Sequence, residues 1–137
     1  AAARYADTLT RLMAADFNHL FHEYDRAVIG EYAGAVSTLG RDAALEFWVG
    51  LRSSFPSATF TVHHVIGMDG GMLSPRASVR WSLDGLHDGW GSFGAPTGKR
   101  VYVWGQSHAE YGPWGLRREF SLYDEVAVWK QILMARG

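Results

Sequence analysis

Apolar residues near the start of the chain recur at three- and four-residue spacing, which is the period of an amphipathic helix. This stripe predicts a helix from about residue 3 to about residue 22, and its members are Leu9, Leu12, Met13, Phe17, Leu20, Phe21 and Tyr24. Residues 27–39 contain glycines and β-branched residues, and they predict a short hairpin or an irregular connection.

A second helix is predicted after this connection. Asp42 is its expected N-cap, and its apolar face is formed by Ala44, Leu45, Trp48 and Leu51. Pro56 ends the helix, because proline disfavours helical backbone at the residue before it.

Beyond Pro56 the apolar period changes from 3.6 to 2, which predicts strands. Residues 58–66 alternate with Phe60, Val62, His64 and Ile66 on one side. Two further alternating segments follow, and Val101–Tyr111 between them is the longest strand candidate. Asp124 is the predicted cap of a closing helix. Early helices, a meander of about four antiparallel strands and a final helix predict an α+β fold.

Composition narrows the possible functions. The 137 residues suit one domain, so we interpret residues 1–137 as a single domain. A net charge of −1 gives no basic field for nucleic acid or an anionic membrane surface. The sequence has no Cys, which removes disulfides and thiolate nucleophiles and fits a cytoplasmic location. No apolar run approaches the roughly 18 residues that span a bilayer.

Several short patterns look like known sites but lack their structural context. Residues 89–94 match the spacing G-x-G-x-x-G, yet Pro96-Thr97-Gly98 follows where a dinucleotide site needs a helix. His19, His22 and Glu23 share a helical face, but no further ligand is evident, so we predict no metal site.

The segment from Arg80 to Lys130 is more specific. A strand ending in Arg80-Trp81 leads into the turn Gly85-Leu86-His87-Asp88-Gly89, the hairpin Pro96-Thr97-Gly98-Lys99 and a strand that contains Gly105. The last strand then runs through Tyr123-Asp124 into the closing helix. This arrangement resembles the SnoaL-like family of polyketide cyclases, within the nuclear-transport-factor-2-like superfamily. The resemblance covers about residues 40–135.

The resemblance implies a cone, in which a curved antiparallel sheet wraps around N-terminal helices and leaves a pocket for a small, largely apolar molecule. It also implies a cofactor-free acid/base enzyme of the cyclase, isomerase or dehydratase type that acts on a small carbonyl compound, and a homodimer formed through the outer face of the sheet. The alternative is a non-catalytic ligand-binding or dimerising accessory module with the same cone, since fold does not decide function.

One position departs from the family. The residue at which the resemblance places the acid/base Asp of the cyclases is Ser107, and serine without a base is a poor proton acceptor. His108 and Glu110 lie close by, but strand alternation puts them on the face opposite Ser107. A bulge near Gly105, an acid/base residue from elsewhere in the chain, or a non-catalytic role would each reconcile this departure.

The candidate catalytic residues are therefore His87 in the Gly-rich turn and His108 with Glu110, which share one strand face at a spacing of two. Each has a structural alternative: a loop-ordering hydrogen bond for His87 and a surface or interface pair for the other two. The predicted pocket residues are Tyr24, Trp48, Arg80, Trp104, Ser107 and Glu119. Helix packing is the alternative for Tyr24 and Trp48, and a cross-strand salt bridge is the alternative for Arg80 and Glu119.

Overall fold

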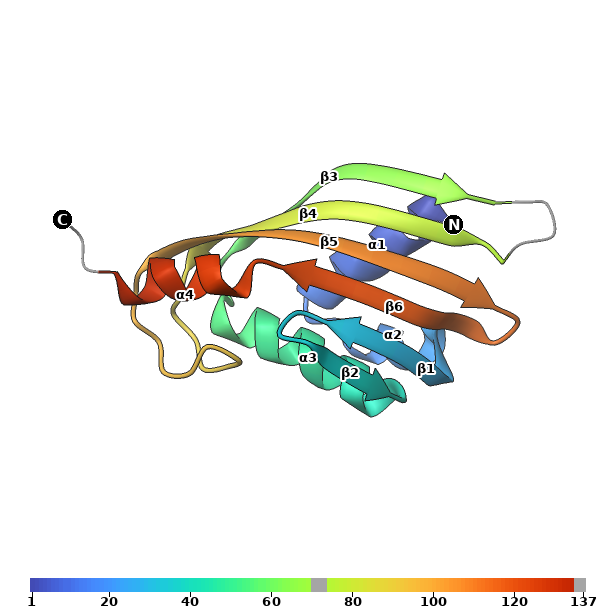
Figure 1. The fold of residues 1–137 in the computed structure, drawn as a ribbon, viewed down its shortest axis with the longest axis horizontal. Coiled ribbons are helices and arrows are strands. Elements are labelled where there is room, and N and C mark those ends of the chain that lie inside the picture. The colour runs from blue at the N-terminus through green and yellow to red at the C-terminus, as the bar shows by residue number, and fades with distance from the viewer. Residues whose placement is uncertain (70–73, 135–137) are drawn as a thin grey trace.

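The computed structural model describes residues 1–69 and 74–134, and within them a sheet of six strands curves around helices (Figure 1). In chain order the elements are α1 (Ala2–Met13), α2 (Asn18–Glu23), β1 (Tyr24–Tyr32), β2 (Val36–Leu39), α3 (Arg41–Ser54), β3 (Thr59–Met68), β4 (Arg76–Leu86), β5 (Arg100–Gly112), β6 (Gly115–Tyr123) and α4 (Glu125–Leu133). The predicted α+β fold is confirmed.

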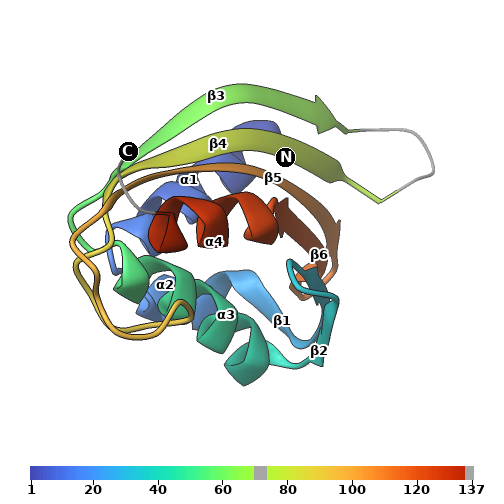
Figure 2. The same cartoon turned by 60° about the vertical axis from the view of Figure 1, so that its left-hand side comes forward.

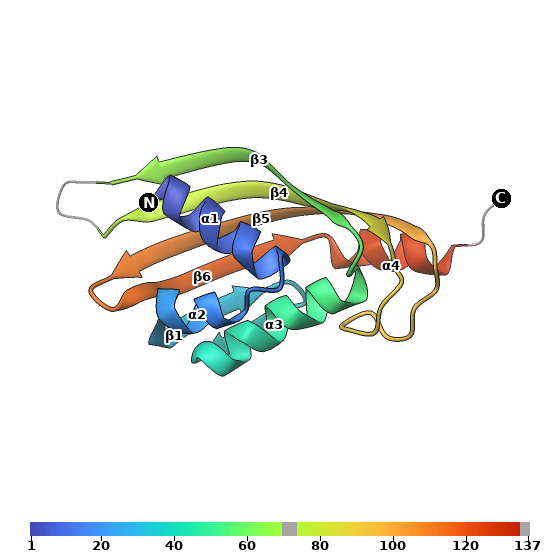
Figure 3. The ribbon, with the colours of Figure 1, turned by 180° about the vertical axis from the view of Figure 1, so that it is seen from behind.

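The strand order is β2-β1-β6-β5-β4-β3. The strands β3 to β6 form the predicted antiparallel meander, and β1 joins its β6 edge in parallel orientation. The sheet arches over α1 and α3, which lie on one face of it, as Figures 2 and 3 show. This shape gives the sheet an inner face against the helices and an outer face against solvent.

The predicted helix over residues 3–22 is wrong in one respect, because it is two helices. Ala15 has a φ of 64°, and the N–H groups of Ala15 and Asp16 donate to the carbonyls of Leu12 and Arg11. This is the Schellman pattern that ends helices, usually with glycine in the left-handed position. Because an alanine occupies that position here, no residue type marks the break. Tyr24 is consequently the first residue of β1 rather than part of a helical stripe.

The start of α3 also differs from the prediction. Its N-cap is Gly40, with a φ of 94°, and Asp42 lies inside the first turn without a capping hydrogen bond. A carboxylate in the first turn still interacts favourably with the helix dipole. The helix ends at Ser54, as the position of Pro56 predicts, and Asp124 caps α4 by accepting a hydrogen bond of 3.0 Å from the Ala127 N–H.

Alternation in β3 is interrupted by a bulge between Val62 and His64. Phe60, Val62 and Val65 pack against the core, whereas Ile66 is 48% exposed. The prediction that His64 and Ile66 share a face with Val62 is therefore wrong, because the extra residue of a bulge reverses the alternation beyond it.

Gly105, inside β5, is a point of close approach between side chain and backbone. Gly105 lies opposite Trp81 in the register of β4 and β5, and a Cβ atom at Gly105 would lie 2.1 Å from the Trp81 ring. The absence of a side chain at Gly105 leaves room for the indole, which packs against Trp48 of α3 with ring centroids 6.3 Å apart. None of the helices within residues 1–69 and 74–134 is long and apolar enough to cross a lipid bilayer.

We predict that Gly105→Ala lowers the free energy of unfolding by about 1–3 kcal/mol, the usual cost of overpacking a core. The added methyl group meets the Trp81 ring, so the same substitution in a Trp81→Phe background is expected to cost less. Urea unfolding of the two single variants and the double variant measures this coupling. Equal losses in both backgrounds would show that the indole does not set the requirement for glycine.

Candidate functional site

The inner face of the sheet carries a row of polar residues on its two central strands. In β6, Glu119 and Ser121 point inward, and they pair with Ala109 and Ser107 of β5. A charged residue at such a position is rare, because burial of an unpaired charge is costly. Its hydrogen bonds therefore decide whether this carboxylate can be accommodated.

Four side chains donate hydrogen bonds to the Glu119 carboxylate. The hydroxyl groups of Tyr5 and Tyr24 donate to Oε2, each at 2.6 Å. The hydroxyl group of Tyr32 and the indole Nε1 of Trp48 donate to Oε1 at 2.7 Å and 3.0 Å. Each oxygen thus accepts two hydrogen bonds, which satisfies the carboxylate in its ionised form. The donors come from α1, β1 and α3, so this contact joins the helices to the sheet.

Burial raises the pKa of Glu119 above its ordinary value, because the charged form is removed from water. The four donors act in the opposite direction, since each of them stabilises the carboxylate. Burial also raises the pKa of Tyr5, Tyr24 and Tyr32, and the neighbouring carboxylate adds to that effect. The phenols therefore stay protonated and remain donors over the whole physiological range of pH.

A second polar group lies beside this carboxylate. Trp81 donates from its indole Nε1 to the Ser107 hydroxyl at 2.9 Å, and the hydroxyls of Ser107 and Ser121 are 2.8 Å apart. Because Ser107 pairs with Ser121, it lies diagonally across from Glu119 on the same inner face. The position that the family resemblance assigns to an acid/base carboxylate thus holds a hydroxyl, and the carboxylate is on the next strand.

The interior is closed to solvent in this conformation. Glu119 and its four donors are each at most 2% exposed, and Ser107 and Ser121 are fully buried. A molecule that reaches Glu119 must therefore displace part of the surrounding structure.

Four of the predicted pocket residues come together at this site: Tyr24, Trp48, Ser107 and Glu119. Tyr5 and Tyr32 were not predicted. Tyr5 precedes Leu9 and Leu12 at helical spacing, and Tyr32 follows Val28 and Gly30 at strand spacing, so both lie on inward-facing stripes. The pattern could show that they are buried, but not that their hydroxyl groups meet at one carboxylate.

Arg80 and Trp104 lie elsewhere. Arg80 is exposed and pairs with Gln106 in the register of β4 and β5, on the outer face. Trp104 is 50% exposed on the same face and packs beside His63, with ring centroids 4.9 Å apart. Neither Arg80 nor Glu119 forms the expected salt bridge within the described part of the chain. Glu119 instead accepts its hydrogen bonds from neutral donors.

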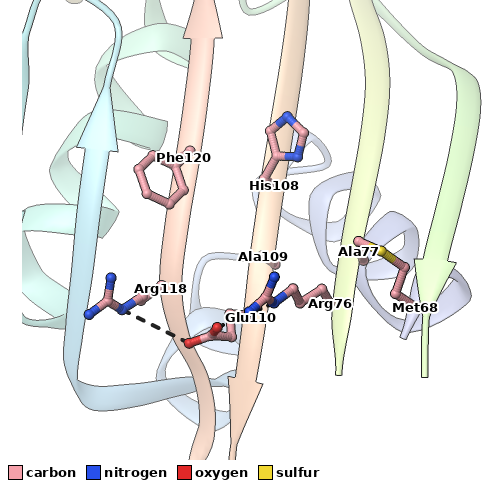
Figure 4. Close-up of a pocket in the computed structure, with 8 residues that line it drawn as sticks. All are labelled: Met68, Arg76, Ala77, His108, Ala109, Glu110, Arg118 and Phe120. Carbon is pink, nitrogen blue, oxygen red and sulfur yellow. Dashed lines mark ion pairs between the residues drawn. The ribbon is translucent and has the colours of Figure 1, made fainter. Parts of the chain in front are cut away.

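His108 and Glu110 also lie on the outer face, as strand alternation predicts. They line a hollow of about 380 Å³ together with Met68, Arg76, Ala77, Ala109, Arg118 and Phe120 (Figure 4). Glu110 forms ion pairs with Arg117 at 2.9 Å, Arg76 at 3.4 Å and Arg118 at 3.9 Å. His108 does not contact the Glu119 site, because the sheet separates them.

His87 is buried at the end of β4, with its Nδ1 3.0 Å from the Thr97 hydroxyl. Its Nε2 is buried without a hydrogen-bond partner among the described residues, and burial lowers the pKa of the imidazole. His87 lies ten residues along β4 from Ala77, which is level with Glu119 in the sheet. This separation corresponds to about 30 Å of strand, so His87 and Glu119 do not share one pocket.

The described residues contain no group of three His, Cys, Asp or Glu side chains placed to hold a metal ion. The groups present at and beside Glu119 are a carboxylate, hydroxyl groups and indole N–H groups. Such a set can move a proton and donate hydrogen bonds to a developing negative charge.

We predict that Glu119→Gln lowers the free energy of unfolding by about 2–4 kcal/mol, because two of the four donors would face an amide NH₂ group that accepts no hydrogen bond. The loss should depend on pH. A raised pKa in the folded state makes the wild-type protein less stable as pH rises from the ordinary carboxyl range to the folded pKa. The gap between the wild-type protein and the variant should therefore narrow over that interval. Urea unfolding of both proteins between about pH 4 and pH 8 measures this difference in the free energy of unfolding.

Tyr32→Phe is the companion variant, because it removes one donor and keeps the carboxylate. It should raise the pKa of Glu119 further and steepen the loss of stability with pH. If the Glu119→Gln variant and the wild-type protein show parallel pH profiles, Glu119 does not have a shifted pKa.

No protein-family profile matches this sequence, and no curated protein matches it either. Solved structures do match. A candidate SnoaL-like polyketide cyclase from Jannaschia sp. CCS1 superposes with a TM-score of 0.79 at 18% identity, over 98% of this chain and 95% of that one. IdmH, a candidate polyketide cyclase from Streptomyces antibioticus, gives a TM-score of 0.74 at 16% identity, over 95% and 96% of the two chains.

AclR, a candidate hydroxylase from Streptomyces galilaeus, has a TM-score of 0.69 at 14% identity, over 96% of this chain and 82% of that one. These similarities extend over nearly the whole chain, the first residues included. The chain therefore has the cone-shaped fold of SnoaL-like polyketide cyclases.

Proposed function

We propose that this protein binds a small, largely apolar carbonyl compound inside the cone and that Glu119 is the acid/base group that acts on it without a cofactor. The observation that carries this proposal is the buried carboxylate itself, held by four donors on the inner face of the sheet. A carboxylate whose pKa is raised by burial is a stronger base than an exposed one. The similarity to IdmH and the Jannaschia protein, both candidate polyketide cyclases, supports the same chemistry.

The proposed reaction begins with proton transfer from carbon. Glu119 takes a proton from the carbon next to the carbonyl group. The C–H electron pair becomes the new C=C bond, and the π pair of the C=O bond moves onto the oxygen to give an enolate. Hydroxyl donors near Glu119, such as Tyr5 or Ser107, stabilise the negative charge on that oxygen. Return of the proton to another carbon gives an isomerase. Alternatively, attack of the enolate carbon on a second carbonyl group closes a ring, and the alkoxide formed there takes up the proton that Glu119 holds.

Glu119 is better placed for this role than the three residues that the sequence suggested. His108 and Glu110 lie on the outer face, where Glu110 is neutralised by ion pairs with arginine side chains. His87 is fixed by Thr97 at the far end of β4. The position of Glu119 is also compatible with the family resemblance. The resemblance places an acid/base carboxylate at Ser107 of β5, and Glu119 supplies a carboxylate on the same inner face from the adjoining strand β6.

A second function is favoured by the saturation of the carboxylate. Both oxygens of Glu119 already accept two hydrogen bonds, so the group is satisfied without any ligand. In that case the network is structural, and the protein is a non-catalytic binding or dimerising module of the same fold.

For both functions we propose a homodimer formed through the outer face of the sheet and a cytoplasmic location. The outer face exposes Trp104, Phe120 and Leu122 at 50%, 42% and 55%. Adjacent apolar side chains of this size mark interaction surfaces. The cysteine-free composition is compatible with a reducing compartment.

The proposal predicts that the protein accelerates exchange of the α-hydrogens of 2-tetralone with D₂O, a flat and apolar ketone that reports proton abstraction directly. Glu119→Gln should slow this exchange by about 100-fold or more, the usual contribution of a general base. Because the base must be ionised, the rate should rise with pH through a pKa above the ordinary carboxyl range. Proton NMR of the ketone follows the reaction.

Glu110→Gln is the matched control, since it makes the same change on the opposite face of the sheet. It should leave the exchange rate unchanged. An equally active Glu119→Gln variant would reject the catalytic proposal, and mass spectrometry of co-purified small molecules would then test the binding function.

A further inference from the structure

The loop between β4 and β5 carries one residue, Phe93, whose side chain is buried while those of its neighbours in the loop are not. Phe93 is 2% exposed, whereas every other residue from 88 to 99 is exposed or half-buried. Trp90 on the same loop is 72% exposed. The loop thus inserts a single aromatic ring into the protein and leaves the rest of its side chains outside.

The Phe93 ring lies in a cage of aromatic side chains from three different elements. Its centroid is 5.0 Å from that of Trp129, 5.6 Å from Phe55 and 6.2 Å from Tyr123. These distances lie in the range of favourable aromatic pairs. Phe55 follows α3, Tyr123 ends β6 and Trp129 belongs to α4, so Phe93 fills the space where these elements meet.

A row of aromatic rings continues from this cage to the buried carboxylate. The Tyr123 ring lies 6.3 Å from Phe47, and Phe47 contacts Trp48 at 4.9 Å and stacks on Tyr32 at 4.1 Å. Trp48 and Tyr32 are the two donors to Oε1 of Glu119. Phe93 therefore lies at the outer end of a continuous row of packed aromatic rings that ends at the candidate acid/base group.

The loop is attached to α3 by few contacts. The N–H groups of Gly89, Ser92 and Phe93 donate to the Ser54 carbonyl, the Gly50 carbonyl and the Ser54 hydroxyl at 3.3 Å, 3.0 Å and 3.2 Å. Figure 2 shows the yellow-to-orange loop running from the ends of β4 and β5 to the end of α3. The Ser57 hydroxyl also donates to the Asp88 carboxylate at 2.6 Å. Release of these four hydrogen bonds and of one ring would free the segment.

The two ends of the loop are fixed much more firmly. The His87 N–H donates to the Lys99 carbonyl at 2.8 Å, and the N–H groups of Thr97 and Gly98 donate to the His87 carbonyl at 3.0 Å and 2.8 Å. Gly94 has a φ of 75° with open space around it, which permits a change of backbone direction there. The segment 88–94 can thus move while its base stays in place.

We propose that residues 88–94 form a gate over the interior site, with Phe93 as its plug, and that the cage of Phe55, Tyr123 and Trp129 binds a flat apolar ring of the ligand when Phe93 leaves. The inference rests on the proposed interior site. It places the first opening toward the closed interior at the outer end of the aromatic row. It also identifies the ligand class, because the cage holds an aromatic ring in the closed state.

Indole is the probe for this cage. In the Phe93→Ala variant the cage is vacant, so indole should bind at least about 10-fold more tightly than to the wild-type protein, in which Phe93 competes for the same space. The indole N–H signals of Trp129 and Trp48 in ¹⁵N-labelled protein should shift on titration. Trp90→Ala, which removes an exposed ring from the same loop, should behave as the wild-type protein does.

Ser54→Ala is the second variant, and it tests the gate if Phe93→Ala does not fold. It keeps the Phe93 ring and removes the hydrogen bond from the Phe93 N–H to the Ser54 hydroxyl. It should strengthen indole binding relative to Ser53→Ala, its neighbour without a side-chain hydrogen bond. A folded Phe93→Ala variant that does not bind indole, or a Trp90→Ala variant that binds it equally well, would overturn the gate. Indole binding does not need Glu119, so failure of the exchange reaction with intact indole binding would reject only the catalytic proposal.

Discussion

The buried carboxylate of Glu119 is the contact on which the rest of this structure depends. It lies on the inner face of β6 and accepts hydrogen bonds from α1, α3 and both ends of β1. A charge in such a place is costly to bury, and only a full set of donors offsets that cost. The same contact therefore fixes the helices against the sheet and retains a basic group in an apolar interior.

This constraint connects the fold to the proposed chemistry. Tyr5, Tyr24 and Tyr32 stay protonated because burial and the neighbouring charge raise their pKa values. They can thus hold the carboxylate in the resting state, and a tyrosine that releases it can donate its single O–H to a substrate oxyanion instead. A ligand can reach the closed interior only if part of the structure moves. The loop that carries Phe93 is proposed to be that part, and three hydrogen bonds join it to α3.

Much of the architecture followed from pattern and resemblance. The change of period at Pro56 and the cap at Asp124 each have a local cause, so the sequence shows them. The break at Ala15 and the bulge after Val62 were not predicted, because an alanine in left-handed backbone and an extra strand residue leave no compositional sign. At the candidate site, Ser107 and Glu119 were found separately. Their grouping with Tyr5 and Tyr32 depends on the parallel pairing of β1 with β6, which no local pattern encodes.

The most direct test of this account is the ionisation of Glu119 itself. The side-chain carboxyl ¹³C signal, assigned by its loss in the Glu119→Gln variant, can be followed by NMR as a function of pH in the folded protein. The account predicts a midpoint above the ordinary glutamate pKa of about 4.3, because burial outweighs the four donors. A midpoint at or below that value would show that the donors dominate, that the group is no stronger a base than an exposed carboxylate, and that the network is structural.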